Sequence, residues 1–331
     1  MKKGMIFSLL LCVLVCGAFA QLTFNGEAYV GARVDKIFNK DETVDLFHRK
    51  KGNPLFNFTA SAVRENYGVK LDVDFVGVAN NISVNGIYGW AGFMDDALHF
   101  SIGQISDSKY ISNLDPDDEV FFDQVKGFRV DYKTPIEGLN AGAAFRAEGQ
   151  LMEDFFKRII LGASYIHPMG NAVVSYDMGN NHRFLFAANY TGMDDLTDAG
   201  IEIYGKNLAS WESRGYTGEL QFREKIGYRI MRPLTVSMLM GQKFFGISDS
   251  DVQLFFRPSA SYRIMPGLTG FLTLEANTPN YFDTTDFYIT PCLEYTLKGT
   301  ALIYVEYQLK LSEYKRDSYH RFGFGIDIKA F

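Results

Sequence analysis

Apolar and polar side chains alternate along most of this chain. Within residues 22–34 the even positions are apolar or small, whereas the odd positions are mostly polar. The same period of two recurs in residues 67–75, 139–148 and 301–311. A period of two is typical of a β-strand that turns one face to an apolar environment and the other to water. Helical spacing is not sustained anywhere, so the pattern predicts an all-β fold.

Dividing the chain at its turns yields eighteen alternating runs. Each is near the length of about 9–11 residues that crosses a bilayer as a tilted strand. An even number of strands brings both termini of a barrel to one side. Sixteen strands is the alternative count, because connections near residues 82–94 and 171–191 are short. The runs cover residues 21–35, 54–64, 66–78, 82–94, 97–106, 125–133, 139–149, 157–167, 171–179, 182–191, 199–208, 215–230, 234–245, 252–264, 268–277, 286–297, 301–312 and 319–331.

A turn motif recurs between these runs. A tyrosine ends one run, a Pro or Gly reverses the chain, and a small or apolar residue starts the next, as in residues 261–269. Proline fixes φ for a tight turn, and glycine tolerates left-handed backbone positions. Successive tyrosines of the motif are 33, 63, 34 and 33 residues apart, so the repeating unit is a pair of strands. They are Tyr132, Tyr165, Tyr228, Tyr262 and Tyr295.

These tyrosines all lie on the apolar parity, at similar distances from a turn. That arrangement predicts a periplasmic aromatic belt, with each ring in lipid and each hydroxyl in water. The alternative is that they pack on turns in a soluble β-sandwich. Strand parity puts the Pro/Gly turns on the side of the termini and the longer, charged connections on the other side. The longer connections are residues 36–53, 107–124, 150–156, 209–214, 278–285 and 312–318.

Charged residues of both signs occupy the polar parity in the middle of most runs. A β-sandwich would turn such charges to bulk water and would rarely concentrate them in every strand. The pattern therefore predicts a transmembrane antiparallel up-and-down β-barrel with a water-filled lumen, short periplasmic turns and longer extracellular loops. The residues predicted to line the pore are Arg33, Lys70, Asp72, Arg129, Asp131, Arg146, Arg158, Arg183, Glu219, Arg223, Lys243, Arg257, Arg263, Glu275, Glu294, Glu306 and Lys310.

The first twenty residues predict an export signal. Lys2 and Lys3 precede an apolar stretch that is too short to span a bilayer, and residues 18–20 form an A-x-A cleavage site. We therefore expect residues 1–20 to be removed and residues 21–331 to form the barrel. Cys16 raises the alternative of a lipoprotein, but Val15 stands where a small residue is required.

Charge and cysteine content narrow the function further. Without Lys2 and Lys3, the mature chain has 31 basic residues against 39 acidic ones, a formal charge of −8, which excludes a typical nucleic-acid-binding protein. Two of the three cysteines lie in the signal peptide, so Cys292 has no partner for an intrachain disulfide. No stretch of the mature chain approaches the roughly 18 apolar residues of a transmembrane helix.

With these features the mature chain resembles the porin-like outer-membrane β-barrels of diderm bacteria. The resemblance rests on the signal peptide, the repeated Tyr/Pro/Gly turns and the last strand, which ends in Phe331. It implies an outer-membrane location, contact with outer-membrane lipid, and recognition of the terminal Phe331 by the barrel assembly machinery. Homotrimers are usual among such porins. The apolar set of the last strand, from Phe322 to Ala330, is one residue out of register with Phe331, so either a bulge or a shifted signal is required.

Three residues conflict with a regular barrel. Pro258 and Pro291 lie inside predicted strands, and each implies a bulge or a locally broken hydrogen bond because proline has no N–H. Glu224 lies on the lipid-facing parity, where a carboxylate is unfavourable. Either a register change or a protomer interface over that strand would resolve the conflict.

The loop at residues 107–124 is the predicted constriction. In the porins that this chain resembles, the third outward loop folds into the lumen and its carboxylates face a basic wall. Phe121 and Phe122 would pack the loop against the wall. The alternative is a solvated surface loop, with a weak Ca²⁺ site at its acidic cluster. The carboxylates predicted to form the constriction are Asp115, Asp117, Asp118, Glu119 and Asp123.

No catalytic motif of the H-E-x-x-H or G-x-S-x-G type is present, and the five histidines are scattered. We therefore expect no enzyme activity, no cofactor and no metal site. The predicted function is a porin that allows passive diffusion of small hydrophilic solutes and ions. The alternative is a surface-exposed structural or adhesin barrel with a closed lumen. A channel for apolar molecules is disfavoured by the charged wall.

Overall fold

The computed structural model of the chain describes most of the predicted barrel. The described residues are 21–37, 43–46, 56–76, 81–110, 112, 114, 125–147, 155–179, 182–191, 196–208, 218–245, 251–280, 284–297, 300–313 and 317–329. The predicted signal peptide, with the alternative lipidation site at Cys16, and the terminal Phe331 lie outside these ranges.

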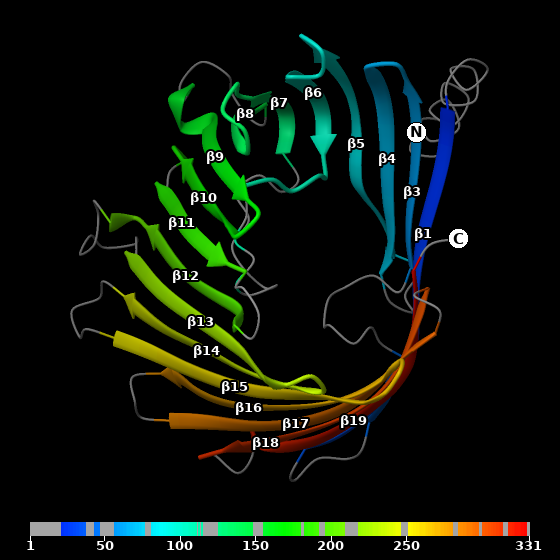
Figure 1. The fold of residues 1–331 in the computed structure, drawn as a ribbon, viewed down its shortest axis with the longest axis vertical. Coiled ribbons are helices and arrows are strands. Elements are labelled where there is room, and N and C mark those ends of the chain that lie inside the picture. Colours follow the sequence, from blue (N-terminus) through cyan, green and yellow to red (C-terminus); the bar gives the residue numbers. More distant parts are fainter. Residues whose placement is uncertain are drawn as a thin grey trace.

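The strands form one closed antiparallel barrel. Each strand of the wall pairs with the next wall strand along the chain, and β1 (Gln21–Ile37) closes the ring by pairing with β19 (Tyr319–Lys329), from Glu27 opposite Lys329 to Ile37 opposite Tyr319. Figure 1 looks into this ring and shows the two end strands side by side. Eighteen strands make up the wall, so the predicted count is confirmed and the alternative of sixteen is wrong.

Every predicted run overlaps one strand of the wall, with ends that differ by a few residues at several strands. After β1, the wall strands are β3 (Phe56–Arg64), β4 (Tyr67–Val76), β5 (Asn81–Phe93), β6 (Leu98–Ile105), β7 (Val125–Lys133), β8 (Leu139–Arg146), β9 (Ile159–His167), β10 (Gly170–Asp177), β11 (Arg183–Tyr190), β12 (Leu196–Lys206), β13 (Glu219–Met231), β14 (Leu234–Phe245), β15 (Asp251–Met265), β16 (Leu268–Asn280), β17 (Thr284–Leu297), β18 (Ala301–Ser312) and β19.

Two short elements were not predicted. β2 (Thr43–Leu46) pairs with residues 32–35 of β1, beyond residues 21–28, which pair with β3. The 3-10 helix η1 (Phe156–Arg158) precedes β9. Within the described ranges, no helix is both long and apolar enough to cross a membrane.

The two faces of the wall differ as the alternation predicts. Large apolar side chains are exposed on the outer face, for example Ile82 at 63% and Ile102 at 58%. On the inner face, charged side chains such as Arg129 (2%) and Glu202 (3%) are buried among their neighbours. A soluble protein buries such apolar groups, because their exposure to water costs about 25 cal/mol per Å².

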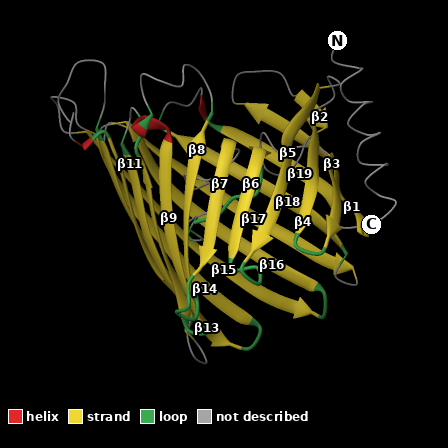
Figure 2. Cartoon of the chain, turned by 90° about the horizontal axis from the view of Figure 1, so that it is seen from above, coloured by secondary structure: helices red, strands yellow, loops and turns green. Residues whose placement is uncertain are grey.

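Short turns connect the strands at the end of the barrel that we call the turn end (Figure 2). Examples are residues 65–66, 168–169 and 266–267. The five predicted belt tyrosines lie near this end on the outer face, and four of them expose 40–48% of their surface. The opposite end, which we call the loop end, includes the connection that begins after β6.

Each of the two prolines lies in a gap of two residue pairs in the strand pairing, without a bulge. Pairing of β15 with β16 stops after Phe256 and resumes at Ser259 in the same register, on either side of Pro258. Pairing of β17 with β18 likewise stops after Ile289 and resumes at Cys292, around Pro291. Of the two predicted consequences, the broken hydrogen bond is therefore correct and the bulge is wrong.

Candidate functional site

Ion pairs, most of them between strands, cover the described inner wall. The strand register places the predicted pore-lining residues of the strands on the inner face, and most form an ion pair with an opposite charge on the same strand, on another strand or on the loop after β6. The pairs include Arg33–Asp35 (3.0 Å), Arg129–Asp131 (3.0 Å), Arg146–Asp177 (2.9 Å), Arg183–Asp177 (2.7 Å), Arg223–Glu202 (3.2 Å), Lys243–Glu219 (2.7 Å), Arg257–Glu275 (2.8 Å) and Lys310–Asp286 (2.8 Å).

Other predicted pore residues have different surroundings. Asp72 accepts a hydrogen bond from the Asn57 amide at 2.8 Å. Arg263 is exposed at the turn end of β15. Glu294 and Glu306 share the inner face with the buried Cys292, whose Sγ lies 3.9 Å from Glu294 Oε1. Whether this face lines an open pore stays a prediction.

Arg158 does not lie in a strand, although the run 157–167 predicted one there. It ends η1, and β9 begins only at Ile159. Its guanidinium donates to the main-chain oxygen of Arg146 at 3.4 Å. The alternation of apolar and polar residues continues into the three residues of this helical turn. A turn of three residues is too short for a helical period to be recognised in the sequence.

The loop after β6 is anchored to the inner wall at Asp107. Its carboxylate accepts hydrogen bonds from the Lys70 ammonium (2.6 Å) and from the Tyr88 hydroxyl, and its main-chain oxygen accepts one from Arg129 (2.6 Å). Burial opposes ionisation of this carboxyl, but the hydrogen bonds from Lys70 and Tyr88 outweigh burial and lower the pKa of Asp107. Asp107 therefore holds the loop to β4, β5 and β7.

Tyr110 continues the anchor along the inner wall. Its hydroxyl donates to Asp131 at 3.1 Å, and its main-chain oxygen accepts from Ser175 on β10 at 2.8 Å. Burial and the charge of Asp131 raise the pKa of the Tyr110 hydroxyl, which keeps it protonated as a donor. Gly142 lies beneath the ring, where a Cβ would approach the hydroxyl oxygen within 2.6 Å. The absence of a side chain at this position permits the close approach.

Leu114 marks how far the described part of the loop reaches. It is 2% exposed and packs with Ala187 of β11, Leu239 of β14 and the partly buried Phe255 of β15. The loop has therefore crossed the inner face of β7–β12 by this residue. Residues 115–124, including the five carboxylates predicted to form a constriction and both phenylalanines, lie outside the described residues.

Apolar side chains fill the space between this loop and the wall. Every strand from β5 to β12 contributes one buried apolar residue to the cluster, and Trp90 packs against it. Sequence reasoning missed this cluster because it assigned the inner parity to polar residues. A signal was present, since Ile159-Ile160 and Val173-Val174 are apolar at both parities. The cluster consists of Tyr88, Ile105, Tyr110, Val125, Ala144, Ile160, Val173, Leu185 and Tyr204.

The inner face of β13–β19 instead combines cations with aromatic rings. Arg257 lies 5.8 Å from the centroid of Phe255, Lys310 lies 5.6 Å from that of Tyr288, and Arg321 lies 4.8 Å from that of Tyr319. Such contacts stabilise a cation by about 0.5–1 kcal/mol where water has access. No group of three or more potential metal ligands occurs among the described residues.

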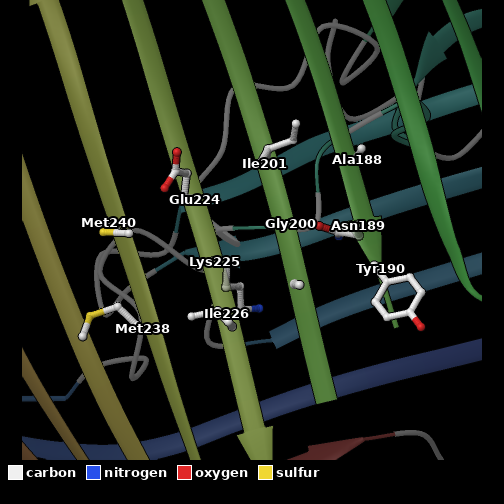
Figure 3. Close-up of a pocket in the computed structure, with 11 residues that line it drawn as sticks. Ala188, Asn189, Tyr190, Gly200, Ile201, Glu224, Lys225, Ile226, Met238 and Met240 are labelled. Atoms are coloured by element: carbon white, nitrogen blue, oxygen red, sulfur yellow. The ribbon is translucent and has the colours of Figure 1, made fainter. Parts of the chain in front are cut away.

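Glu224 lies on the outer face, as its parity predicts. Register is continuous on both sides, with Ile201 of β12 and Met240 of β14 directly opposite, so a register change does not remove the conflict. Figure 3 shows the carboxylate between these two side chains. They line a shallow outer hollow of about 500 Å³ with Ala188, Tyr190, Ala199, Ile226 and Met238. A protomer interface at this place stays a prediction.

Comparison by sequence reveals no relatives. No protein-family model matches the chain, and no curated protein sequence matches it significantly. The fold is therefore known from structure alone.

Comparison by structure identifies outer-membrane barrels. The chain is similar to OccK2 (OpdF) of Pseudomonas aeruginosa with a TM-score of 0.63, 10% identity, and coverage of 94% of this chain and 98% of that one. It is also similar to the anion-selective porin of Comamonas acidovorans (TM-score 0.58, 14% identity, 94% and 100% covered). A loop-deletion mutant of the Vibrio cholerae outer-membrane protein OmpT gives a TM-score of 0.58 at 12% identity, with 94% and 99% covered. The chain thus has the fold of a porin-like outer-membrane β-barrel.

Proposed function

From this fold, we propose that the protein is an outer-membrane porin, a passive channel for small hydrophilic solutes and ions. It has no catalytic role in this proposal. The observation that carries the proposal is the distribution of charge over a closed wall of eighteen strands. Ionised side chains line the inner face of β13–β19 in partly exposed pairs such as Arg257–Glu275, at 31% and 21% exposure, and apolar side chains cover the outer face. A wall of this kind is stable with water inside and hydrocarbon outside.

The loop at residues 107–124 narrows the channel in this proposal. Its described part is anchored at Asp107 and Tyr110 and reaches Leu114 on the far side of β12. The proposal places the carboxylates from Asp115 to Asp123 opposite the cations of β13–β19. Opposite charges across a narrowing create a transverse field that orients dipolar solutes and disfavours large apolar ones.

The mature chain is exported and placed in the outer membrane of a diderm bacterium, in this proposal. Cleavage after Ala20 releases residues 21–331, and the belt tyrosines settle at the periplasmic interface. Phe331 serves as the signal for the barrel assembly machinery, and the protein forms homotrimers. The described part of β19 contains no bulge as far as Lys329, which favours a shifted assembly signal over a repaired one.

Planar-bilayer recordings of the refolded mature chain test the channel directly. We expect discrete conductance steps that grow with salt concentration, because the lumen is filled with water. The alternative is a structural or adhesin barrel whose lumen is closed, and the apolar packing inside β5–β12 favours it. Silent membranes with fully inserted protein would reject the porin and support that alternative, which then predicts binding to a host or matrix ligand by the long loops.

A further inference from the structure

Leu114 is inserted into an apolar seat on the inner wall, which we define as Ala187, Gly200, Leu239 and Phe255. Its side chain is 2% exposed and packs with Ala187, Leu239 and Phe255. Gly200 leaves room at the floor of the seat, because a Cβ there would lie 3.2 Å from Leu114 Cδ1. The seat therefore holds one branched aliphatic side chain against a wall that is otherwise largely ionic.

Charged side chains on β12–β16 around the seat form ion pairs with one another. The guanidiniums of Arg223 and Arg257 also lie 5.9 Å and 5.8 Å from the centroid of the Phe255 ring. The three pairs are neutral overall, so the seat favours an uncharged ligand over an ion. The pairs are Arg223–Glu202 (3.2 Å), Lys225–Asp198 (2.5 Å) and Arg257–Glu275 (2.8 Å).

The seat also contains an unused hydrogen-bond acceptor. Asn189 lies directly opposite Gly200 on the neighbouring strand (Figure 3), and a Cβ on Gly200 would lie 2.2 Å from Asn189 Oδ1. This oxygen is buried and accepts no hydrogen bond from the part of the chain that the structure describes. The main-chain N–H of Leu114 donates to Ser112 instead, at 3.3 Å. An unpaired buried acceptor is unfavourable, and the Leu114 side chain has no donor for it.

We propose that the seat is a binding site for small neutral solutes that carry a branched aliphatic group and a hydrogen-bond donor, and that Leu114 is its intramolecular occupant. The aliphatic group replaces Leu114 between Ala187 and Leu239, and the donor binds Asn189 Oδ1. Since the two cannot occupy the seat together, binding of the solute releases the loop at Leu114. That release widens the channel, an effect that rests on the proposed function, whereas the binding itself does not.

The loop competes with the solute as a tethered ligand. Asp107 and Tyr110 hold the loop on the wall, so Leu114 stays at a high local concentration after it leaves the seat. A free solute must therefore be abundant to displace it, and a weaker Leu114 contact favours the solute. This competition distinguishes the seat from an ordinary binding site, at which truncation of a neighbouring side chain weakens binding.

Equilibrium dialysis of the mature chain in detergent micelles measures the binding, with empty micelles as the blank. The probe is isotope-labelled N-acetyl-leucinamide, which has an isobutyl group and amide N–H donors but no charge. N-acetyl-glycinamide is the matched control, because it lacks only the isobutyl group. We expect saturable binding of the leucine amide and binding of the glycine amide that is about tenfold or more weaker, since burial of the aliphatic group drives association.

Leu114→Ala should bind N-acetyl-leucinamide about tenfold or more tightly, because the competing side chain no longer fills the seat. Leu302→Ala truncates another leucine of the inner face and should leave binding unchanged. Asn189→Ala removes the acceptor and should weaken binding about threefold to tenfold. Amide exchange over residues 107–110 should become faster as the probe saturates the unsubstituted chain, because the loop is released.

Weaker or unchanged binding by Leu114→Ala would overturn the proposal, as would equal binding of the two amides. Unchanged or slower amide exchange at saturating probe would also overturn it, since the solute would then bind beside a docked loop. Leu114 lies in a loop, so its truncation leaves the barrel folded. None of these measurements needs current through the protein. A barrel that binds the leucine amide but does not conduct would therefore refute the porin and retain the seat, and a conducting barrel without binding would do the reverse.

Discussion

The inner wall of this barrel has two unlike halves. Over β5–β12 the loop and the wall enclose apolar side chains and the Arg129–Asp131 pair, whose side chains are 2% and 9% exposed. Over β13–β19 the described ion pairs range from Lys310–Asp286, whose side chains are 16% and 10% exposed, to Arg257–Glu275, at 31% and 21%. The first half resembles the core of a soluble protein, whereas the second remains partly accessible to water.

The difference implies that breaking an ion pair should cost more stability in the first half than in the second. A buried charge that loses its partner is left without solvent, whereas an exposed charge is rehydrated. Ion pairs of the loop-covered half should therefore contribute most to the unfolding free energy, and ion pairs of β13–β19 should determine ion selectivity. The following substitutions test that division.

Asp131→Ala should have the largest effect. It removes the carboxylate that neutralises the buried Arg129 guanidinium and that accepts the hydrogen bond from Tyr110. We therefore expect a loss of about 3–5 kcal/mol in unfolding free energy. Urea unfolding in lipid vesicles, followed by tryptophan fluorescence, measures this loss. A change below about 1 kcal/mol would show that water reaches Arg129 and would abolish the contrast between the halves.

Leu114→Ala should release the end of the described loop. Removing the side chain that packs on Ala187 and Leu239 should cost about 2–3 kcal/mol of local docking free energy, and we expect larger channel conductance with faster amide exchange over residues 107–114. Leu302→Ala is the control, because Leu302 lies half-buried on the inner face of β18. Equal effects of the two truncations would contradict loop docking at Leu114.

Glu224→Leu should stabilise the barrel in a bilayer by about 1–2 kcal/mol, because a carboxylate on the lipid face is unfavourable. Glu219→Leu changes the inner face of the same strand and leaves Lys243 without its partner, so it should have the opposite sign. Unfolding from lipid vesicles measures both. Destabilisation by Glu224→Leu would indicate that the carboxylate has a partner in the membrane, as a protomer interface requires.

Asp107→Asn should remove a pH-dependent part of loop anchoring, worth about 1 kcal/mol at neutral pH. The pKa of Asp107 is lowered in the folded chain, so its contribution is complete above the ordinary aspartate pKa of about 3.9 and is lost as pH falls through the lower folded value. Amide exchange at residues 107–110 between pH 7 and pH 3 would report it. An identical pH profile in the variant would exclude this carboxylate as the titrating group.

Glu275→Ala should have the smallest effect on stability, below about 1 kcal/mol, because Arg257 is partly hydrated. Its effect should appear in the reversal potential, which should shift toward anion selectivity in 0.1 M salt and diminish in 1 M salt as charges are screened. A large loss of stability with no change in selectivity would show that the two halves are equivalent.

The alternation predicted the barrel well. The strand positions, the even count and the outward position of Tyr228 and Tyr262 follow from a period of two, and all are present. The pattern also placed Glu224 on the outer face, and the structure rules out a register change there. It failed where a residue's environment depends on the loop, as for Ile160 and Leu185, which are apolar on the inner face because the loop covers them.

What the linear pattern settled is the orientation of each strand, because neighbouring residues of a strand point to opposite faces whatever the rest of the chain does. What only the tertiary structure decided is which part of the inner wall is dry. The Ser175–Tyr110 contact joins residues 65 positions apart, and Leu114 reaches Leu239 only because the loop turns inward. Local alternation contains no information on such contacts between distant residues. They depend on the closure of the ring and on the path of the loop after β6 along its inner wall.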